Sequence, residues 1–216
     1  NNKWAFSKKA SEAPRRMPLF WEKVNLPHCW NAKDGQDGGN DYFRGTCCYC
    51  KQITKSQLPT TQKYYLEIQG ANSSADVYLD GKHLAHHDGG YSTWRVNLTD
   101  ALTEEENLLS IVVDNAANET VYPQMADFTF YGGIYRTVNI ICVIESHFDL
   151  DHFGGPGIKI TPAITGADAQ VEVEVFVTNG QLGQSIHYTL LDAQGNTVAE
   201  TTCNDTKVVL NIPNVH

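Results

Sequence analysis

The chain has 216 residues, 41% of them hydrophobic and 19% charged, so it can bury one or two ordinary cores and is unlike a disordered chain. Its formal net charge is −9 and its basic residues are mostly scattered, which argues against nucleic-acid binding. No apolar run approaches the ~20 residues that span a bilayer, and residues 1–6 contain no apolar core of a signal peptide.

Three of the six cysteines, Cys47, Cys48 and Cys50, lie within four positions. On a strand, Cys48 and Cys50 would share one face. A zinc site would need four ligands, and only Cys29 or His28 offers a fourth. We therefore expect small buried side chains here, and the lack of a disulfide framework favours a reducing compartment.

Strand patterns dominate the chain up to about residue 145. Residues 64–68 alternate apolar and polar side chains, and residues 108–113 form an apolar run typical of a buried strand. Between them, Asp80 and Gly81 separate two apolar alternations, which predicts a hairpin with a type I′ turn. Residues 99–102 predict one short helical turn with Thr99 as its N-cap. A further strand is expected over residues 137–144.

Glycine and proline at residues 154–157 break any regular element and mark a domain boundary. We predict an all-β chain with a larger β-sandwich over residues 1–145 and a smaller one over residues 146–216. In the second unit, residues 171–177 place four valines on one face of a strand, and residues 190–198 form a hairpin with a longer turn. About five strands are expected there, whereas an immunoglobulin-like sandwich has ~7, so this sandwich is expected to be incomplete.

Three clusters could carry chemistry. Residues 34–42 alternate carboxylates with glycines, which suits an exposed ligand-binding loop but does not match an EF-hand. His86 and His87 are adjacent and should point to opposite faces of a strand, which argues against a shared metal. Residues 127–136 join one carboxylate to aromatics and a double glycine, the groups that bind sugars, although a structural loop with inward aromatics is an equal alternative. No recognisable pair of catalytic carboxylates is present.

Residues 127–136 (DFTFYGGIYR) resemble the signature near the end of the sugar-binding jelly-roll domain of glycoside hydrolase family 2. Further segments resemble the family in the same order: residues 26–31 (LPHCWN), 42–45, 76–81, 89–91, 98–100 and 152–157. The resemblance implies a galactose-binding-like jelly-roll sandwich followed by an incomplete immunoglobulin-like sandwich. One departure lies at residues 48–50, where Cys-Tyr-Cys replaces the Trp-Tyr-Arg that is frequent in the family.

The resemblance also implies a function. The parent protein would be a retaining β-galactosidase, with β-glucuronidase as the alternative, because residues 130–134 (FYGGI) differ from the Asn-Tyr-Ala-Gly-Ile usual in the β-glucuronidase branch. Asp127 corresponds to the aspartate that contacts the substrate sugar, and Asn40 and Asp41 are further candidates for substrate binding. The catalytic glutamates of the family lie on a downstream (β/α)8 barrel, so this chain should be inactive alone and should not measurably bind galactose.

The same resemblance suggests the setting of the protein. We expect a β-galactoside as the substrate, no cofactor in this chain, Mg²⁺ or Na⁺ near the barrel of the full-length enzyme, and a homo-oligomer. A bacterial cytoplasmic location is expected, with a periplasmic or secreted one as the alternative. Two other classes of function stay open: a stand-alone carbohydrate-binding module, because jelly rolls host many lectins, and a structural or oligomerisation domain.

Overall fold

The computed structural model describes residues 1–34, 42–122 and 130–214. These residues form two compact units, Asn1–Cys142 and Val143–His216, divided a few residues before the boundary expected from the sequence. The prediction of an all-β chain is confirmed, and a 3-10 turn at Lys55–Gln57 is the one helical element in the described ranges. None of the described helical segments is long and apolar enough to cross a membrane.

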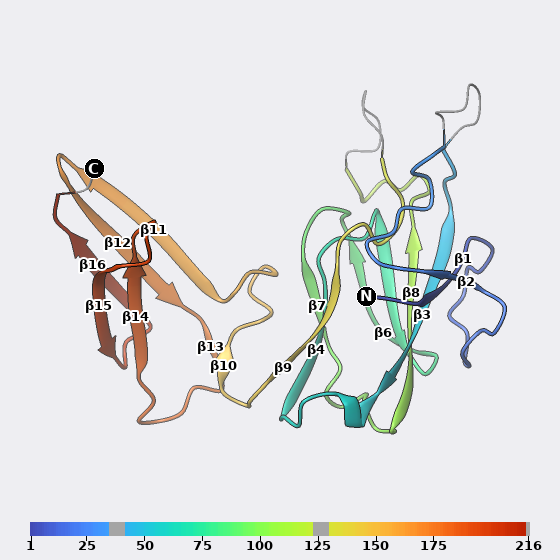
Figure 1. Cartoon of the computed structure of the whole chain (residues 1–216), viewed down its shortest axis with the longest axis horizontal. Helices are drawn as coiled ribbons and strands as arrows, with labels where there is room; N and C mark the ends of the chain where they lie inside the picture. The colour runs from blue at the N-terminus through green and yellow to red at the C-terminus, as the bar shows by residue number, and fades with distance from the viewer. Residues whose placement is uncertain (35–41, 123–129, 215–216) are drawn as a thin grey trace. The chain divides into compact units, whose positions relative to one another are not determined.

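The first unit is a sandwich of two antiparallel sheets (Figure 1). Six strands lie in the order β2-β1-β3-β8-β5-β6 and three in the order β7-β4-β9. Their bounds are Trp4–Ser7 (β1), Glu22–Val24 (β2), Thr46–Thr54 (β3), Lys63–Ile68 (β4), Ser74–Leu79 (β5), Lys82–Asp88 (β6), Trp94–Asn97 (β7), Glu106–Asp114 (β8) and Val138–Val143 (β9). One core cluster joins side chains of both sheets, which makes this unit a sandwich.

Strand β8 is buried from Asn107 to Val113 because both of its faces are covered. Leu109 and Ile111 face the core between the sheets, whereas Leu108 and Val112 face the opposite side. There the segment between β1 and β2 packs against the sheet through side chains such as Met17 and Trp21. A strand covered on both faces loses the apolar–polar alternation, which explains the continuous apolar run in the sequence.

The predicted hairpin is confirmed. Strands β5 and β6 meet across Asp80 and Gly81, whose φ angles of 51° and 78° are those of a type I′ turn. The Asp80 carboxylate accepts a hydrogen bond of 2.7 Å from the backbone N–H of Leu108, which fastens the turn to β8. A β-bulge between Val77 and Tyr78 then shifts the register of the hairpin by one residue.

The cysteines of β3 are small buried side chains, as the sequence predicts. Cys47 faces the core between the sheets, and Cys48 and Cys50 share the opposite face, with their sulfur atoms 3.8 Å apart. Ser110 on the neighbouring β8 lies 3.4 Å from the Cys50 sulfur. Burial raises the pKa of the Cys47 thiol to about 12, so this thiol stays protonated at neutral pH.

The second unit contains five longer strands, the number expected, and two strands of two residues in its described part. Their bounds are His147–Phe148 (β10), Ile158–Thr165 (β11), Asp168–Val175 (β12), Val177–Thr178 (β13), Ile186–Leu191 (β14), Thr197–Cys203 (β15) and Lys207–Ile212 (β16). They form the sheets β11-β12-β16, β14-β15 and β10-β13. The predicted hairpin at residues 190–198 is confirmed as β14 and β15.

One expectation for this unit needs correction. Val171, Val173 and Val175 share a buried face of β12, but Val177, expected on the same strand, belongs to β13. At Phe176 the pairing changes partner: its N–H donates to the carbonyl of Gly157, next to β11, and its carbonyl accepts from the backbone N–H of Asp149, next to β10. The three valines pack with Tyr188 and others in the core of this unit.

Candidate functional site

The three substrate-binding residues expected from the sequence, Asn40, Asp41 and Asp127, lie outside the described residues. The structure does describe the backbone that flanks the two segments carrying them, residues 35–41 and 123–129. Buried and exposed polar side chains hold these flanks at one end of the sandwich. There Thr46 is the first residue of β3, Ser74 is the first residue of β5 and Asp114 is the last residue of β8. Asp114 pairs with Thr46 on one side and with Ser74 on the other.

The ends of segment 35–41 are tied to one another and to the core. The N–H of Phe43 donates to the Asp34 carboxylate at 3.0 Å, which links the two flanks. Asn115, 5% exposed, donates to the carbonyl of Phe43 and accepts from the N–H of Gly45 at 2.9 Å. The indole N–H of Trp30 also reaches the Phe43 carbonyl, at 3.4 Å. The chain therefore leaves this segment at a fixed position.

Two more buried asparagines hold the backbone that follows segment 123–129. Asn31, 1% exposed, accepts from the N–H of Gly132 at 2.9 Å and donates to the carbonyl of Phe130 at 3.2 Å. Asn72 donates to the carbonyl of Tyr131 at 2.8 Å, and its backbone forms a bridge with Gly133. A side-chain amide suits this task because it satisfies a backbone donor and a backbone acceptor at once.

The double glycine of the signature is required by packing. A Cβ on Gly132 would lie 2.4 Å from the Trp30 ring and 2.5 Å from the Asn115 amide nitrogen. Gly133 has a φ of +123°, and its Cβ would lie 2.6 Å from the carbonyl oxygen of His28. Both positions exclude any larger residue, because the signature backbone lies directly on residues 28–30.

The described side chains of the signature, residues 130–136, divide between core and surface. Ile134 is fully buried, and the Tyr135 hydroxyl donates to the carbonyl of Gly90. Tyr131, in contrast, is 46% exposed. In the described part of the cluster, the Tyr131 side chain is thus exposed enough to meet a ligand, whereas Ile134 and Tyr135 build the fold.

His28 belongs to the support of the signature. Its backbone N–H donates to the carbonyl of Ile134 at 2.7 Å, and its ring lies 2.8 Å from the hydroxyl of the buried Tyr49. Burial lowers the pKa of His28, so the ring is neutral at pH 7. The sequence segment 26–31 therefore acts as the base on which residues 130–134 rest.

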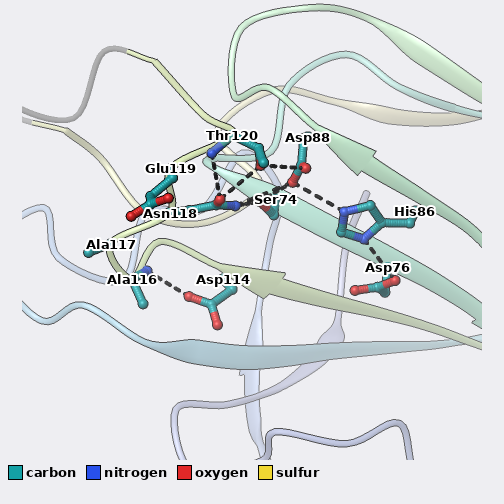
Figure 2. Close-up of a pocket in the computed structure, with 10 residues that line it drawn as sticks. All are labelled: Ser74, Asp76, His86, Asp88, Asp114, Ala116, Ala117, Asn118, Glu119 and Thr120. Carbon is teal, nitrogen blue, oxygen red and sulfur yellow. Dashed lines mark hydrogen bonds and ion pairs between the residues drawn. The ribbon is translucent and has the colours of Figure 1, made fainter.

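The backbone preceding segment 123–129 is held by a cluster of polar side chains that we call the Asp88 clasp: Ser74, Asp88, Asn118 and Thr120 (Figure 2). The Asp88 carboxylate accepts from the hydroxyls of Ser74 at 2.6 Å and Thr120 at 2.7 Å, and from the Asn118 amide at 3.4 Å. The two hydroxyl donors hold the pKa of Asp88 below its ordinary value. The clasp borders an open cavity of about 520 Å³, which Asp76, Asp114 and Glu119 also line.

His86 connects the clasp to β5. Its ring lies between Asp76 and Asp88, at 3.0 Å and 3.1 Å from their carboxylate oxygens (Figure 2). Burial works to lower the pKa of His86, but the two carboxylates outweigh it and raise the pKa above 6.5. His87 lies on the opposite face, as predicted, where its ring stacks on Trp94 at 4.8 Å. Among the residues that the structure describes, no three acidic, histidine or cysteine side chains form a metal site.

Comparisons with known proteins agree with this architecture. Residues 42–132 match the glycosyl hydrolase 2 galactose-binding domain-like family. A putative β-glucuronidase of Formosa agariphila is 32% identical over 84% of this chain and 22% of its own length. A β-galactosidase of Thermoanaerobacterium thermosulfurigenes is 29% identical over 65% of this chain and 20% of its own.

Among solved structures, the FMN-binding β-glucuronidase of Facaelibacterium prausnitzii L2-6 superposes on the whole chain with a TM-score of 0.89 and 38% identity. The chain covers 33% of that protein, so it spans between a fifth and a third of the length of these relatives. The chain therefore belongs to glycoside hydrolase family 2 and corresponds to the N-terminal part of its members, whose galactose-binding-like domain it carries at residues 42–132.

Proposed function

We propose that the whole protein is a retaining β-glycosidase that hydrolyses terminal β-glucuronides, and that this chain is its non-catalytic N-terminal part. The observation that carries the proposal is the 38% identity to a β-glucuronidase over the whole chain. The 32% identity to a second protein named putative β-glucuronidase supports it. This order reverses the one expected from the signature, which placed β-galactosidase first.

In this proposal the chain contributes to the sugar site without performing the bond cleavage. Retaining hydrolysis uses one carboxyl group as nucleophile and another as acid and base, about 5–5.5 Å apart across the scissile bond. We assign those carboxyls to a catalytic barrel elsewhere in the whole protein. Asp127 would bind sugar hydroxyls, since a carboxylate accepts strong hydrogen bonds, and Asn40 and Asp41 are the further candidates.

The buried support described above gives this role a physical basis. A residue that orients a sugar must be held within a fraction of an ångström, and a rigid scaffold achieves this better than a free loop. Asn31, Asn72 and Asn115 fix the flanks of both candidate segments to the core of the sandwich. These buried polar side chains thus lie where the proposal requires a rigid backbone.

β-Galactosidase is the second candidate, and one observation favours it. The signature reads Phe-Tyr-Gly-Gly-Ile at residues 130–134, without the Asn-Tyr-Ala that we associate with the β-glucuronidase branch. A protein named β-galactosidase also shares 29% identity with this chain.

Hydrolysis of 4-nitrophenyl β-glucuronide and 4-nitrophenyl β-galactoside by the whole protein separates the two candidates. A site built to bind the carboxylate of glucuronic acid should reject the galactoside by on the order of 10³-fold or more in kcat/KM. A preference for the galactoside would transfer the assignment to β-galactosidase. Cleavage of neither substrate would refute both and would favour a carbohydrate-binding module.

A further inference from the structure

The segment from Asp114 to Tyr122 leaves the end of β8 and runs to the described limit at residue 122. Its first turn is held by Asp114, whose carboxylate accepts from the N–H of Ala116 at 2.6 Å. Its far part is held by Asn118, whose side-chain oxygen accepts from the N–H of Thr120 at 2.9 Å. These bonds shape the segment locally, but they do not fix it to the sheet beyond its first turn.

Two hydrogen bonds from the far part converge on Asp88, the last residue of β6, and a third runs from the Asn118 amide to the Ser74 hydroxyl at 3.0 Å. The two Asp88 carboxylate oxygens receive Thr120 and Asn118 from the segment, and Ser74 from the first position of β5. Three separate stretches of chain therefore meet at one carboxylate. Hydrogen bonds to a charged acceptor are the stronger kind, so removal of this carboxylate should loosen the segment, which keeps the bond from Asn118 to Ser74.

We propose that Asp88 is a positioning residue of the sugar site: through Thr120 and Asn118 it holds residues 114–122 against β5 and β6, without itself touching the sugar. This role rests on the proposed function, because it concerns the chain that leads towards the candidate substrate-binding residues. Val121, which is buried, and Tyr122, which is 91% exposed, are the residues whose places it sets.

The first test measures the clasp itself by amide hydrogen exchange of peptides covering residues 114–122 in the whole protein. Thr120→Val removes one donor with little change of shape and no change of charge, and Asp88→Ala removes the shared acceptor. Thr120→Val should raise exchange in this segment about tenfold, the effect of one lost charge-assisted bond, and Asp88→Ala should raise it at least as much. Glu119→Gln is the matched control, since Glu119 lies in the same segment outside the clasp, and it should leave exchange unchanged. Equal exchange in all three variants and the wild type would overturn the proposal.

The second test measures the consequence for the sugar. Asp88→Ala and Thr120→Val should raise the KM of the preferred nitrophenyl glycoside several-fold with a smaller change in kcat, and Asp88→Asn, which keeps one acceptor oxygen, should recover part of the loss. A merely structural role would loosen the segment and leave both constants unchanged, which would overturn the positioning role. If the wild-type protein cleaves neither glycoside, the proposed function fails, and the exchange result still decides whether the clasp exists.

Discussion

Replacement of Asn31 by alanine tests the buried support of the signature most sharply. The change removes the acceptor of the Gly132 N–H and the donor to the Phe130 carbonyl, at a site where the side chain is 1% exposed. A buried backbone N–H left without its partner, here that of Gly132, costs about 1–3 kcal/mol, and loss of the bond to the Phe130 carbonyl adds about 0.5–1.5 kcal/mol. We therefore expect the free energy of unfolding of the first unit to fall by about 2–4 kcal/mol.

Urea denaturation followed by tryptophan fluorescence measures this loss selectively. All four tryptophans, Trp4, Trp21, Trp30 and Trp94, lie in the first unit, so the signal reports that unit and not the second. Asn2→Ala, at an exposed position, is the control and should change stability by less than about 0.5 kcal/mol. If Asn31→Ala unfolds at the same urea concentration as the wild type, the asparagine does not support the signature and the reasoning fails.

Three further predictions follow from the contacts of the first unit. Gly132→Ala should destabilise it by about 1–3 kcal/mol or more, because the added Cβ overlaps the Trp30 ring; the same urea titration measures it, and an unchanged midpoint would contradict the packing. Arg95→Met should cost about 3 kcal/mol at pH 7 by leaving the Glu67 carboxylate buried without its cation. Burial works to raise the pKa of Glu67, but Arg95 and two amide donors outweigh it and lower this pKa below 4.5. The cost of Arg95→Met should therefore shrink as the pH falls from 4.5 through the lowered pKa, and a cost that grows would contradict the reasoning. Because the pKa of His86 is raised, its stabilising contribution is complete below pH 6.5 and is lost as the pH rises through the raised value. The difference in stability between wild type and His86→Gln should therefore close towards alkaline pH, and a difference that stays constant would contradict this prediction.

The strands and the hairpin turn were predictable because they depend on neighbours in sequence. Alternation identified β4 and β12, and Asp80 with Gly81 identified a type I′ turn. The register beyond that turn was not predictable, since the bulge between Val77 and Tyr78 leaves no signal in the local pattern. Without the bulge Asp76 would not pair with His86, and the polar network around Asp88 could not have been deduced from the sequence.

The side chains that support the candidate site could not be predicted from the sequence for a related reason. Asn31 and Gly132 are 101 positions apart, and their hydrogen bond depends on the packing of the whole sandwich. From the sequence alone, Asn31 would be expected on the surface as a polar residue. Only its burial in the structure shows that it supports the signature backbone. The family resemblance identified residues 26–31 and 127–136 as motifs. It did not indicate that residues 26–31 support residues 130–134.

The most direct test of the central claim, that this chain supplies part of the sugar site, is the activity of Asp127→Ala in the whole protein. Hydrolysis of 4-nitrophenyl β-glucuronide should be measured beside Glu119→Gln, which removes an equal charge from a neighbouring segment. Loss of a hydrogen bond between a carboxylate and the sugar should lower kcat/KM by about 10- to 150-fold, while the control stays within about twofold. A wild-type kcat/KM in Asp127→Ala would contradict the claim and leave the chain a structural role.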